Sequence, residues 1–160
     1  MLAALAAAVP PYGRILALGT SAGTGTAWIV AGLADREDVE VTSAGPDPAT
    51  TDPAHRGVWP SYVAFAADET TALYEGSPYD LVFADAPGGT FDHLDLTVAA
   101  LRPRGHLLVD DTQPAAGDDA FELERPSEIR KALLDHPQLI SVELDCSTAL
   151  VLSTRLTETD

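Results

Sequence analysis

The chain has 160 residues, of which 9 are Lys or Arg and 25 are Asp or Glu, so its formal charge at neutral pH is -16. This length suits a single domain over residues 1–160, and a hydrophobic content of 46% is enough to build a core. Binding to nucleic acids or to anionic membranes depends mainly on Lys and Arg, which are scarce here. We therefore expect a folded, acidic protein that binds neither nucleic acid nor membrane.

The compartment is predicted from the cysteine content and from the apolar runs. Cys146 is the only cysteine, so an internal disulfide cannot form and nothing favours an oxidising compartment. The apolar stretch 2–9 lacks the basic residues that precede a secretory signal, and no run reaches the roughly 18 apolar residues of a membrane-spanning helix. These features predict a cytoplasmic protein.

Short apolar runs alternate with helical segments along the chain, which predicts a parallel sheet with helices on its faces. In the first half, strands are expected at 14–18, 39–43 and 62–66, and helices at 2–9, 24–33 and 68–74. In the second helix, Ala27, Trp28, Val30 and Leu33 recur at helical intervals and are expected to pack on the preceding strand. Prolines in the segment 45–59 predict a short or distorted crossover helix.

The second half predicts two more parallel strands and a terminal hairpin. A strand is expected at 79–84, followed by a helix whose face includes Leu94, Val98 and Leu101 and which ends at Pro103. A strand at 106–109 and a helix at 126–135, with proline at its tolerated first turn, come next. The runs 139–144 and 149–152 are too close for a helical crossover, so they predict an antiparallel hairpin. This gives seven strands.

A glycine-rich loop, Gly19 to Gly25 (GTSAGTG), follows the first predicted strand. Its small residues would let a ligand approach the backbone, and ligands of open parallel sheets lie beyond the carboxyl ends of the strands. The spacing GxxxGxG differs from the GxGxxG of dinucleotide binders, and no Gly-Lys-Ser/Thr follows as in a P-loop. A tight turn without a ligand is the alternative interpretation.

Three segments of the chain occur in the order and spacing of one family. They are GTSAGTG at 19–25, YDLVFADA at 79–86 and LRPRGHLLVDDT at 101–112. From residue 2 to residue 156 the chain resembles class I S-adenosylmethionine-dependent methyltransferases, and specifically the O-methyltransferases of the catechol and caffeoyl-CoA type. The resemblance implies a Rossmann-like three-layer α/β/α sandwich. Its seven-stranded, mostly parallel sheet would have the order 3-2-1-4-5-7-6 and end in an antiparallel hairpin. The implied activity is O-methyl transfer from S-adenosylmethionine to a small-molecule acceptor.

The resemblance also implies which residues bind the cofactor. Those that would line its methionine and ribose portions are Gly19, Thr20, Ser21, Gly23 and Gly25. Asp68 matches the acidic position near the adenine, where a carboxylate can accept from the exocyclic amine. Asp47 is a displaced substitute for the acid that normally binds the ribose hydroxyls, and Asp85 completes the expected cofactor site.

A second set of acids follows the fourth and fifth predicted strands. In metal-dependent members, the positions of Asp85, Asp110 and Asp111 hold a hard divalent cation, so the resemblance implies Mg²⁺ or another divalent cation as a further cofactor. Asp85, Asp110 and Asp111 would orient or activate the acceptor. The alternative is that these carboxylates are solvated or cap the next helix.

The sequence departs from the family at several functional positions. Ala17 and Gly45 stand where the family has acids that organise the cofactor, and Gly88 replaces the lysine that helps to deprotonate the acceptor. His93 is the nearest group able to act as a general base near neutral pH. Its flanking acids are also typical of a solvated helix face. Trp28 and Trp59 are interpreted as packing residues.

The resemblance implies several helices ahead of the first strand, of which only the final turns are present. A homodimer or another partner subunit is therefore expected to complete a lid over the site, because an uncovered site positions its substrate poorly. Two alternatives stay open. One is a degenerate methyltransferase fold that acts as a binding or partner subunit, and the other is a nucleotide-linked oxidoreductase.

Overall fold

The computed structural model describes residues 1–19, 23–45, 59–66, 68–85, 93–110, 120–145 and 150–157. In the helix that begins at residue 120, side chains are described from residue 127 onward. The predicted crossover helix within 45–59 lies almost wholly outside the described residues.

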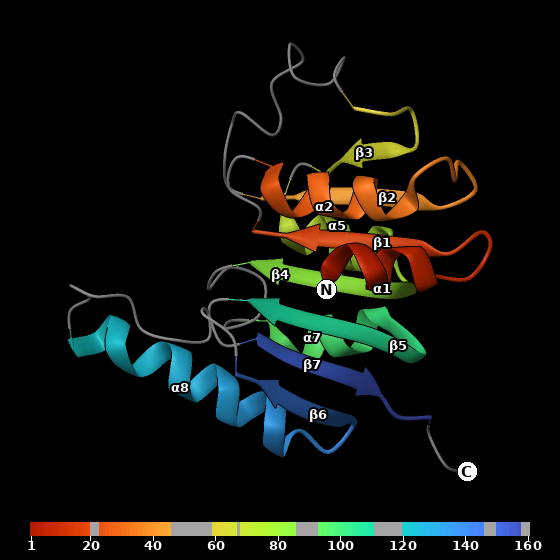
Figure 1. Cartoon of the computed structure of the whole chain (residues 1–160). Coiled ribbons are helices and arrows are strands. Elements are labelled where there is room, and N and C mark those ends of the chain that lie inside the picture. The colour runs from red at the N-terminus through yellow and green to blue at the C-terminus, as the bar shows by residue number, and fades with distance from the viewer. Residues whose placement is uncertain are drawn as a thin grey trace.

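The described residues form a seven-stranded sheet in the order β3-β2-β1-β4-β5-β7-β6 (Figure 1). The strands are β1 (Arg14–Leu18), β2 (Glu40–Ala44), β3 (Val63–Phe65), β4 (Tyr79–Asp85), β5 (Leu101–Asp110), β6 (Leu139–Leu144) and β7 (Leu150–Arg155). The first five are parallel, whereas β7 pairs antiparallel with both β5 and β6. The predicted order and the terminal hairpin are confirmed.

Helices cover both faces of the sheet, as predicted. One face carries α1 (Leu2–Ala8) and α2 (Thr24–Leu33), and the other carries α5 (Glu69–Glu75), α7 (Leu94–Ala100) and α8 (Ala120–Asp135). Because side chains of a strand alternate between faces, β1 sends Ile15 and Ala17 into the first core and Leu16 and Leu18 into the second. The result is a three-layer α/β/α sandwich.

The bounds of α2 were predicted correctly, but its buried face was not. Trp28 is 59% exposed, while Gly25, Thr26 and Ile29 are buried. The helix is apolar on most of its circumference, so periodicity alone cannot select a face. The buried face carries Gly25, Thr26, Ile29 and Leu33, and beside it Gly32 lets α1 approach closely, since a Cβ there would lie 2.1 Å from the carbonyl oxygen of Ala3. The predicted packing role of Trp28 is therefore wrong.

The boundary between α7 and β5 also differs from the prediction. The helix ends at Ala100, and Leu101 already has extended dihedrals, φ -75° and ψ 148°. Proline disfavours the helical region for the residue before it, so Pro103 favours extended chain from this point. A register shift between Tyr79 and Leu81 of β4 accommodates the extra residues of β5, among which Arg104 has φ 68°.

Two other elements are longer than predicted. The helix α8 begins at Ala120, six residues before the predicted start at 126, because proline in a first turn is a common but not a necessary start signal. The strand β7 continues past the predicted end at 152 to Arg155, because Thr154 and Arg155 pair with Ile140 and Leu139 of β6.

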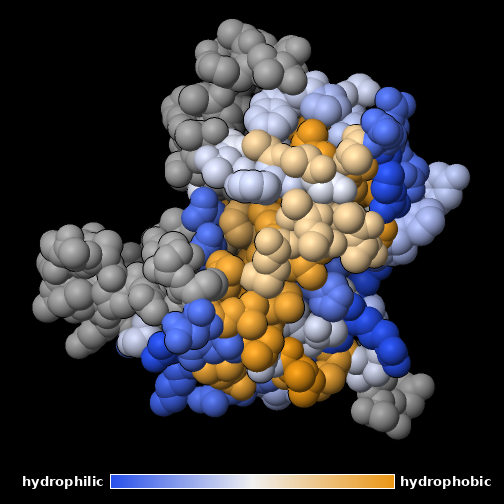
Figure 2. Space-filling model, viewed as in Figure 1, coloured by the Kyte–Doolittle hydropathy of each residue, from blue (hydrophilic) through white to orange (hydrophobic). Residues whose placement is uncertain are grey.

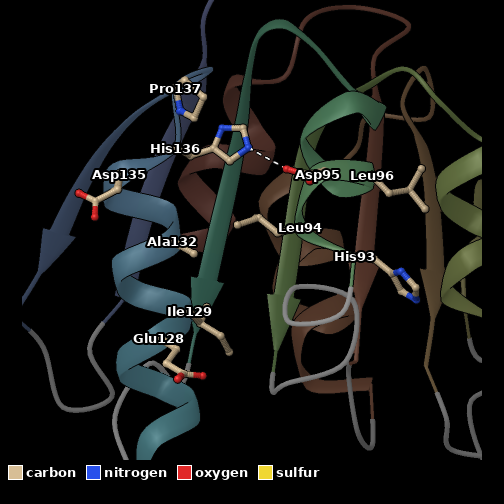
Figure 3. Close-up of a pocket in the computed structure, with 10 residues that line it drawn as sticks. All are labelled: His93, Leu94, Asp95, Leu96, Glu128, Ile129, Ala132, Asp135, His136 and Pro137. Carbon is tan, nitrogen blue, oxygen red and sulfur yellow. Dashed lines mark hydrogen bonds and ion pairs between the residues drawn. The ribbon is translucent and has the colours of Figure 1, made fainter.

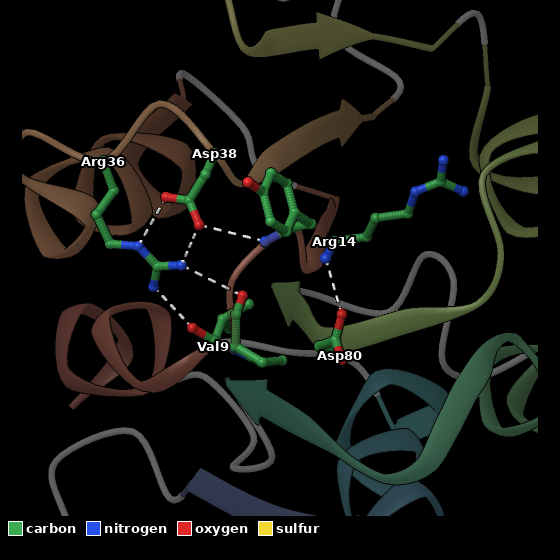
Figure 4. Close-up of polar contacts among 7 residues, drawn as sticks. Val9, Arg14, Arg36, Asp38 and Asp80 are labelled. Atoms are coloured by element: carbon green, nitrogen blue, oxygen red, sulfur yellow. Dashed lines mark hydrogen bonds and ion pairs between the residues drawn. The ribbon is translucent and has the colours of Figure 1, made fainter.

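A polar network ties the loops at the amino-terminal edge of the sheet together (Figure 4). Arg36 donates to Asp38 at 2.7 Å and to the carbonyl oxygen of Val9 at 2.7 Å, and the backbone amide of Tyr12 donates to Asp38. The hydrogen bond from Arg36 lowers the pKa of Asp38 to about 2. This network fixes the entry to β1 and the entry to β2.

Among the described residues, no helix combines the length and the hydropathy that crossing a membrane requires.

Candidate active site

The loop that follows β1 needs glycine at both of its described ends. Gly19 has φ 69° and Gly23 has φ 72°, a region that side chains rarely adopt. A Cβ on Gly19 would also lie 2.1 Å from the carbonyl oxygen of Asp85, and the amide of Gly19 donates to the carbonyl of Ala44 at 2.9 Å. The ends of β1, β2 and β4 thus meet in a close backbone contact at Gly19, which we call the cradle and which a side chain there would disrupt.

Trp59 packs against this cradle. Its ring carbon Cζ2 lies 3.1 Å from where a Cβ on Gly23 would stand, and its ring centroid is 6.4 Å from that of Phe65. The predicted packing role of Trp59 is confirmed. The sequence did not predict that Trp59 lies beside the glycine loop.

Asp85 and Asp110 lie next to each other at the carboxyl ends of β4 and β5. They are direct partners in the parallel register, and neighbouring strands are about 4.8 Å apart. Together with Thr24 and Gly25 at the start of α2, they line a cavity of about 280 Å³. The apolar residues that complete its lining are Met1, Leu2, Ala3, Trp28, Phe83, Leu108 and Leu150. The structure therefore brings three of the predicted site residues, Gly25, Asp85 and Asp110, to one hollow.

Asp68 has a structural role that the sequence analysis did not assign. It is the N-cap of α5, where its carboxylate accepts from the backbone amide of Thr71 at 2.7 Å and from the hydroxyl of Thr71 at 2.9 Å. These hydrogen bonds lower the pKa of Asp68. Its predicted contact with the adenine stays a prediction.

His93 and the two aspartates line different cavities. It is the exposed N-cap of α7 and lines a different cavity, of about 620 Å³, between α7 and α8 (Figure 3). In the same cavity, Nε2 of His136 lies 3.3 Å from Asp95, and the amide of Gln138 donates to Nδ1 of His136. The catalytic role predicted for His93 stays a prediction, and the structure does not place it with Asp85.

Glu69 is a candidate that sequence reasoning missed. Its Oε1 atom is buried without a hydrogen-bond partner among the described residues, and it lies 3.8 Å from the Cβ position of Gly19. Burial raises the pKa of the Glu69 carboxyl. The sequence shows only that Glu69 is an acid that directly follows Asp68, shortly after the third strand. Nothing in that pattern predicts that the Glu69 carboxyl is buried. Glu69 supplies a carboxylate beside the glycine cradle.

Several predicted positions lie outside the described residues, namely Thr20, Ser21, Asp47, Gly88 and Asp111. Within the described ranges, no group of three or more His, Cys, Asp or Glu side chains could hold a metal ion. Asp85 and Asp110 offer carboxylate oxygens, which hard divalent cations prefer, so the metal site stays a prediction that needs Asp111. Ala17, where the family has an acid, is fully buried in the apolar core under α1 and α2.

No protein-family model and no curated protein matches the sequence. Solved structures do match, and together with the sheet order they show that the chain has the fold of class I S-adenosylmethionine-dependent methyltransferases.

Three of these structures carry a ligand. A cofactor-bound protein from MTB has a TM-score of 0.77 and 21% identity, over 96% of this chain and 77% of that one. The O-methyltransferase from Bacillus cereus in complex with S-adenosylhomocysteine (SAH) has a TM-score of 0.75 and 15% identity, over 96% and 78%. The O-methyltransferase TomG from Streptomyces achromogenes, involved in tomaymycin synthesis and bound to S-adenosylmethionine, has a TM-score of 0.70 and 17% identity, over 98% and 78%. At these identities the likeness is one of fold.

Proposed function

We propose that the protein transfers a methyl group from S-adenosylmethionine to an oxygen of a small molecule. The observation that carries this proposal is the cavity of about 280 Å³ that joins the start of α2, beside the glycine loop, to the paired carboxylates of Asp85 and Asp110. Cofactor-binding and acceptor-binding groups thus line one hollow at the carboxyl edge of the sheet, where open parallel sheets bind ligands. Structures of the same fold that contain SAH or S-adenosylmethionine support the choice of cofactor.

The described ends of the loop are glycines because a Cβ on Gly19 would collide with the carbonyl of Asp85 and one on Gly23 would press on the ring of Trp59. The neighbouring Glu69 provides a carboxylate for a hydroxyl or amine of the ligand. When bound, S-adenosylmethionine supplies an activated methyl group. The role of the chain is to hold the acceptor oxygen in line with that group, which is a large part of the rate enhancement in such transfers.

The acceptor would be oriented by Asp85 and Asp110. A carboxylate at either position accepts a hydrogen bond from an acceptor hydroxyl and takes its proton as the oxygen attacks. Phe83 and Leu108 help to exclude water from this end of the cavity. The same carboxylates, with Asp111, are the residues that would hold a divalent cation, which would lower the pKa of the hydroxyl.

Calorimetric titration of the purified protein with SAH tests the cofactor assignment. We expect saturable binding, weakened in Gly19→Ala. No heat at millimolar SAH would contradict the proposal, whereas nicotinamide dinucleotide binding would favour the oxidoreductase alternative.

Transfer from labelled S-adenosylmethionine to a panel of phenols, with Mg²⁺ or with a chelator, then tests turnover. Asp110→Asn is expected to abolish most transfer while SAH still binds. Glu143→Gln is the matched control, because it removes a carboxylate at a remote ion pair with Arg130. Cofactor binding without transfer to any acceptor would favour the partner-subunit alternative.

A further inference from the structure

We infer that two copies of this chain associate edge to edge through β6, with the two Val142 residues opposite each other across a two-fold axis. The inference goes beyond the proposed function and does not rest on it. Three observations carry it, namely the open edge of β6, the exposed apolar side chains on one face of that strand, and the way its sequence can pair with a second copy of itself.

The strand β6 is regular and stands at an edge of the sheet. In the described part of the chain it pairs with β7 alone, over six residue pairs from Leu139 to Leu144, and Figure 1 shows no further strand beyond it. Proteins commonly protect such an edge with a short strand, a lysine, a proline or a bulge. The opposite edge is protected in the first way, since β3 has three residues. None of these features occurs in β6 (LISVEL), so its edge can pair with another strand.

One face of β6 is apolar and exposed. Val142 pairs with Leu152, which pairs with Leu108 of the core under α1 and α2, so Ile140 and Val142 lie on that face. Ile140 is 64% exposed and Val142 is 50% exposed, and no described helix lies over them. Figure 2 shows apolar surface below α1, on the side where Figure 1 has β7 and β6. Exposed apolar surface of this kind marks a place where proteins associate.

Charge favours a second copy as the occupant of this edge. The one charged residue of β6 is Glu143, and its carboxylate lies 3.1 Å from Arg130 of α8. The strand therefore brings no unbalanced charge to an interface. Each copy has a net charge of -16, so two copies repel each other elsewhere and meet most easily along a strand of this kind. A basic partner would instead bind over the acidic part of the surface.

The backbone of β6 can pair with a second, antiparallel β6. The amide of Leu156 donates to the carbonyl of Gln138 at 2.8 Å, next to the first pair of the β6–β7 ladder. Because bonded and non-bonded pairs alternate along such a ladder, Ser141 and Glu143 direct their backbone groups away from β7. A two-fold axis at Val142 places Ser141 of each copy opposite Glu143 of the other. Their backbone groups then bond between the copies.

The same axis brings apolar side chains together. Val142 meets the second Val142 as a non-hydrogen-bonded pair, in which Cα atoms are about 4.5 Å apart and side chains are close. Ile140 lies opposite Leu144 of the second copy, on the same face. Apolar β-branched residues paired in this way stabilise antiparallel strands. The sequence of β6 is thus complementary to itself in this register.

The strength of the association follows from its size and from the charge of the chain. Two paired six-residue strands by themselves bury less than the roughly 1,600 Å² of a standard interface, so we expect a dissociation constant in the micromolar range. Salt screens the repulsion between two acidic chains but does not weaken apolar and backbone contacts. Raised salt should therefore tighten the dimer.

Sedimentation velocity of the full chain tests the association. We expect monomer at about 1 μM and dimer at about 100 μM, with a lower dissociation constant at about 0.5 M than at about 0.15 M NaCl. Val142→Lys should raise the dissociation constant at least about tenfold, because it places two like charges opposite each other. The matched control is Tyr74→Lys, at an exposed tyrosine of α5, which should dimerise as the wild type does. Urea unfolding verifies that both variants are folded.

Three results of this experiment would overturn the inference. They are a monomer at about 100 μM in wild type, an equal loss of dimer in both lysine variants, and a dimer that salt dissociates. Failure of SAH to bind would contradict the proposed function and would leave this inference unaffected.

Disulfide formation tests the register. In a Cys146→Ser background, which removes the native cysteine, Val142→Cys treated with oxidised glutathione should give a covalent dimer, because a disulfide needs Cα atoms within about 7 Å. The matched control is Ile140→Cys on the same face. Its two copies would lie about four residues apart along the strands, roughly 13 Å, so they should stay unlinked. A covalent dimer of Ile140→Cys, or none of Val142→Cys, would overturn the pairing at Val142.

Discussion

Replacing Gly19 by alanine tests the backbone cradle directly. A left-handed conformation costs an L-residue about 1–2 kcal/mol, and Gly19 has φ 69°. The new Cβ would also stand 2.1 Å from the backbone carbonyl of Asp85, so β1 or β4 must move. We expect Gly19→Ala to lower the free energy of unfolding by about 3 kcal/mol or more, since a strain of this kind adds to the conformational cost.

Gly23→Ala separates the conformational cost of a positive φ from the cost of the steric clash. Its φ of 72° carries the same conformational cost, but the nearest atom to the new Cβ is a ring carbon of Trp59 at 3.1 Å, and a side chain can shift. The expected loss is therefore about 1–2 kcal/mol. Urea unfolding of both variants measures the difference. A Gly19→Ala protein that is as stable as Gly23→Ala would refute the close approach of the loop to Asp85.

Cofactor binding by the same variants needs a control for instability. Gly105→Ala places a Cβ 2.9 Å from the carbonyl of Arg102 at the opposite edge of the sheet, so it destabilises without touching the cradle. We expect Gly105→Ala to bind SAH as the wild type does, and Gly19→Ala to bind it at least about tenfold more weakly at temperatures where both are folded. Equal weakening in both variants would mean that lost stability, and not the cradle, is responsible.

Three further predictions concern stability. Asp68→Ala should cost about 1 kcal/mol, since it removes the cap that accepts from Thr71 at 2.7 Å; an unchanged urea midpoint would contradict the capping role. Tyr79→Phe should cost about 1 kcal/mol, because its buried hydroxyl donates to a backbone carbonyl at 2.7 Å, and a neutral result in thermal unfolding would count against that bond. Arg36 lowers the pKa of Asp38 from 3.8 to about 2, so this pair stabilises the fold above pH 4 and its contribution is lost as the pH falls toward 2. In Asp38→Asn, the free energy of unfolding should depend less on pH between pH 4 and pH 2. The same pH dependence in the variant and the wild type would show that the pair does not contribute.

Much of the candidate site could be predicted because it follows directly from strand ends. Gly19, Asp85 and Asp110 each stand at the end of an apolar run, and the carboxyl ends of parallel strands meet at one edge. The direct pairing of Asp85 with Asp110 then follows from the strand order. Glu69 could not be found in this way, because the burial of its Oε1 atom depends on how the start of α5 lies against Gly19 and not on any local pattern.

The sequence by itself determined the elements and their order. Apolar runs of strand length, prolines and glycines at their ends, and a connection too short for a crossover define five parallel strands and a closing hairpin, because these are local properties of the chain. The tertiary structure alone decided which faces became buried. Trp28 is exposed because α2 turns Thr26, Ile29 and Leu33 toward the core. Ile140 and Val142 are exposed apolar residues of β6 on the face that carries α1 and α2, and no described helix lies over them. Such outcomes depend on contacts between segments far apart in the chain, and a periodic pattern within one segment does not contain them.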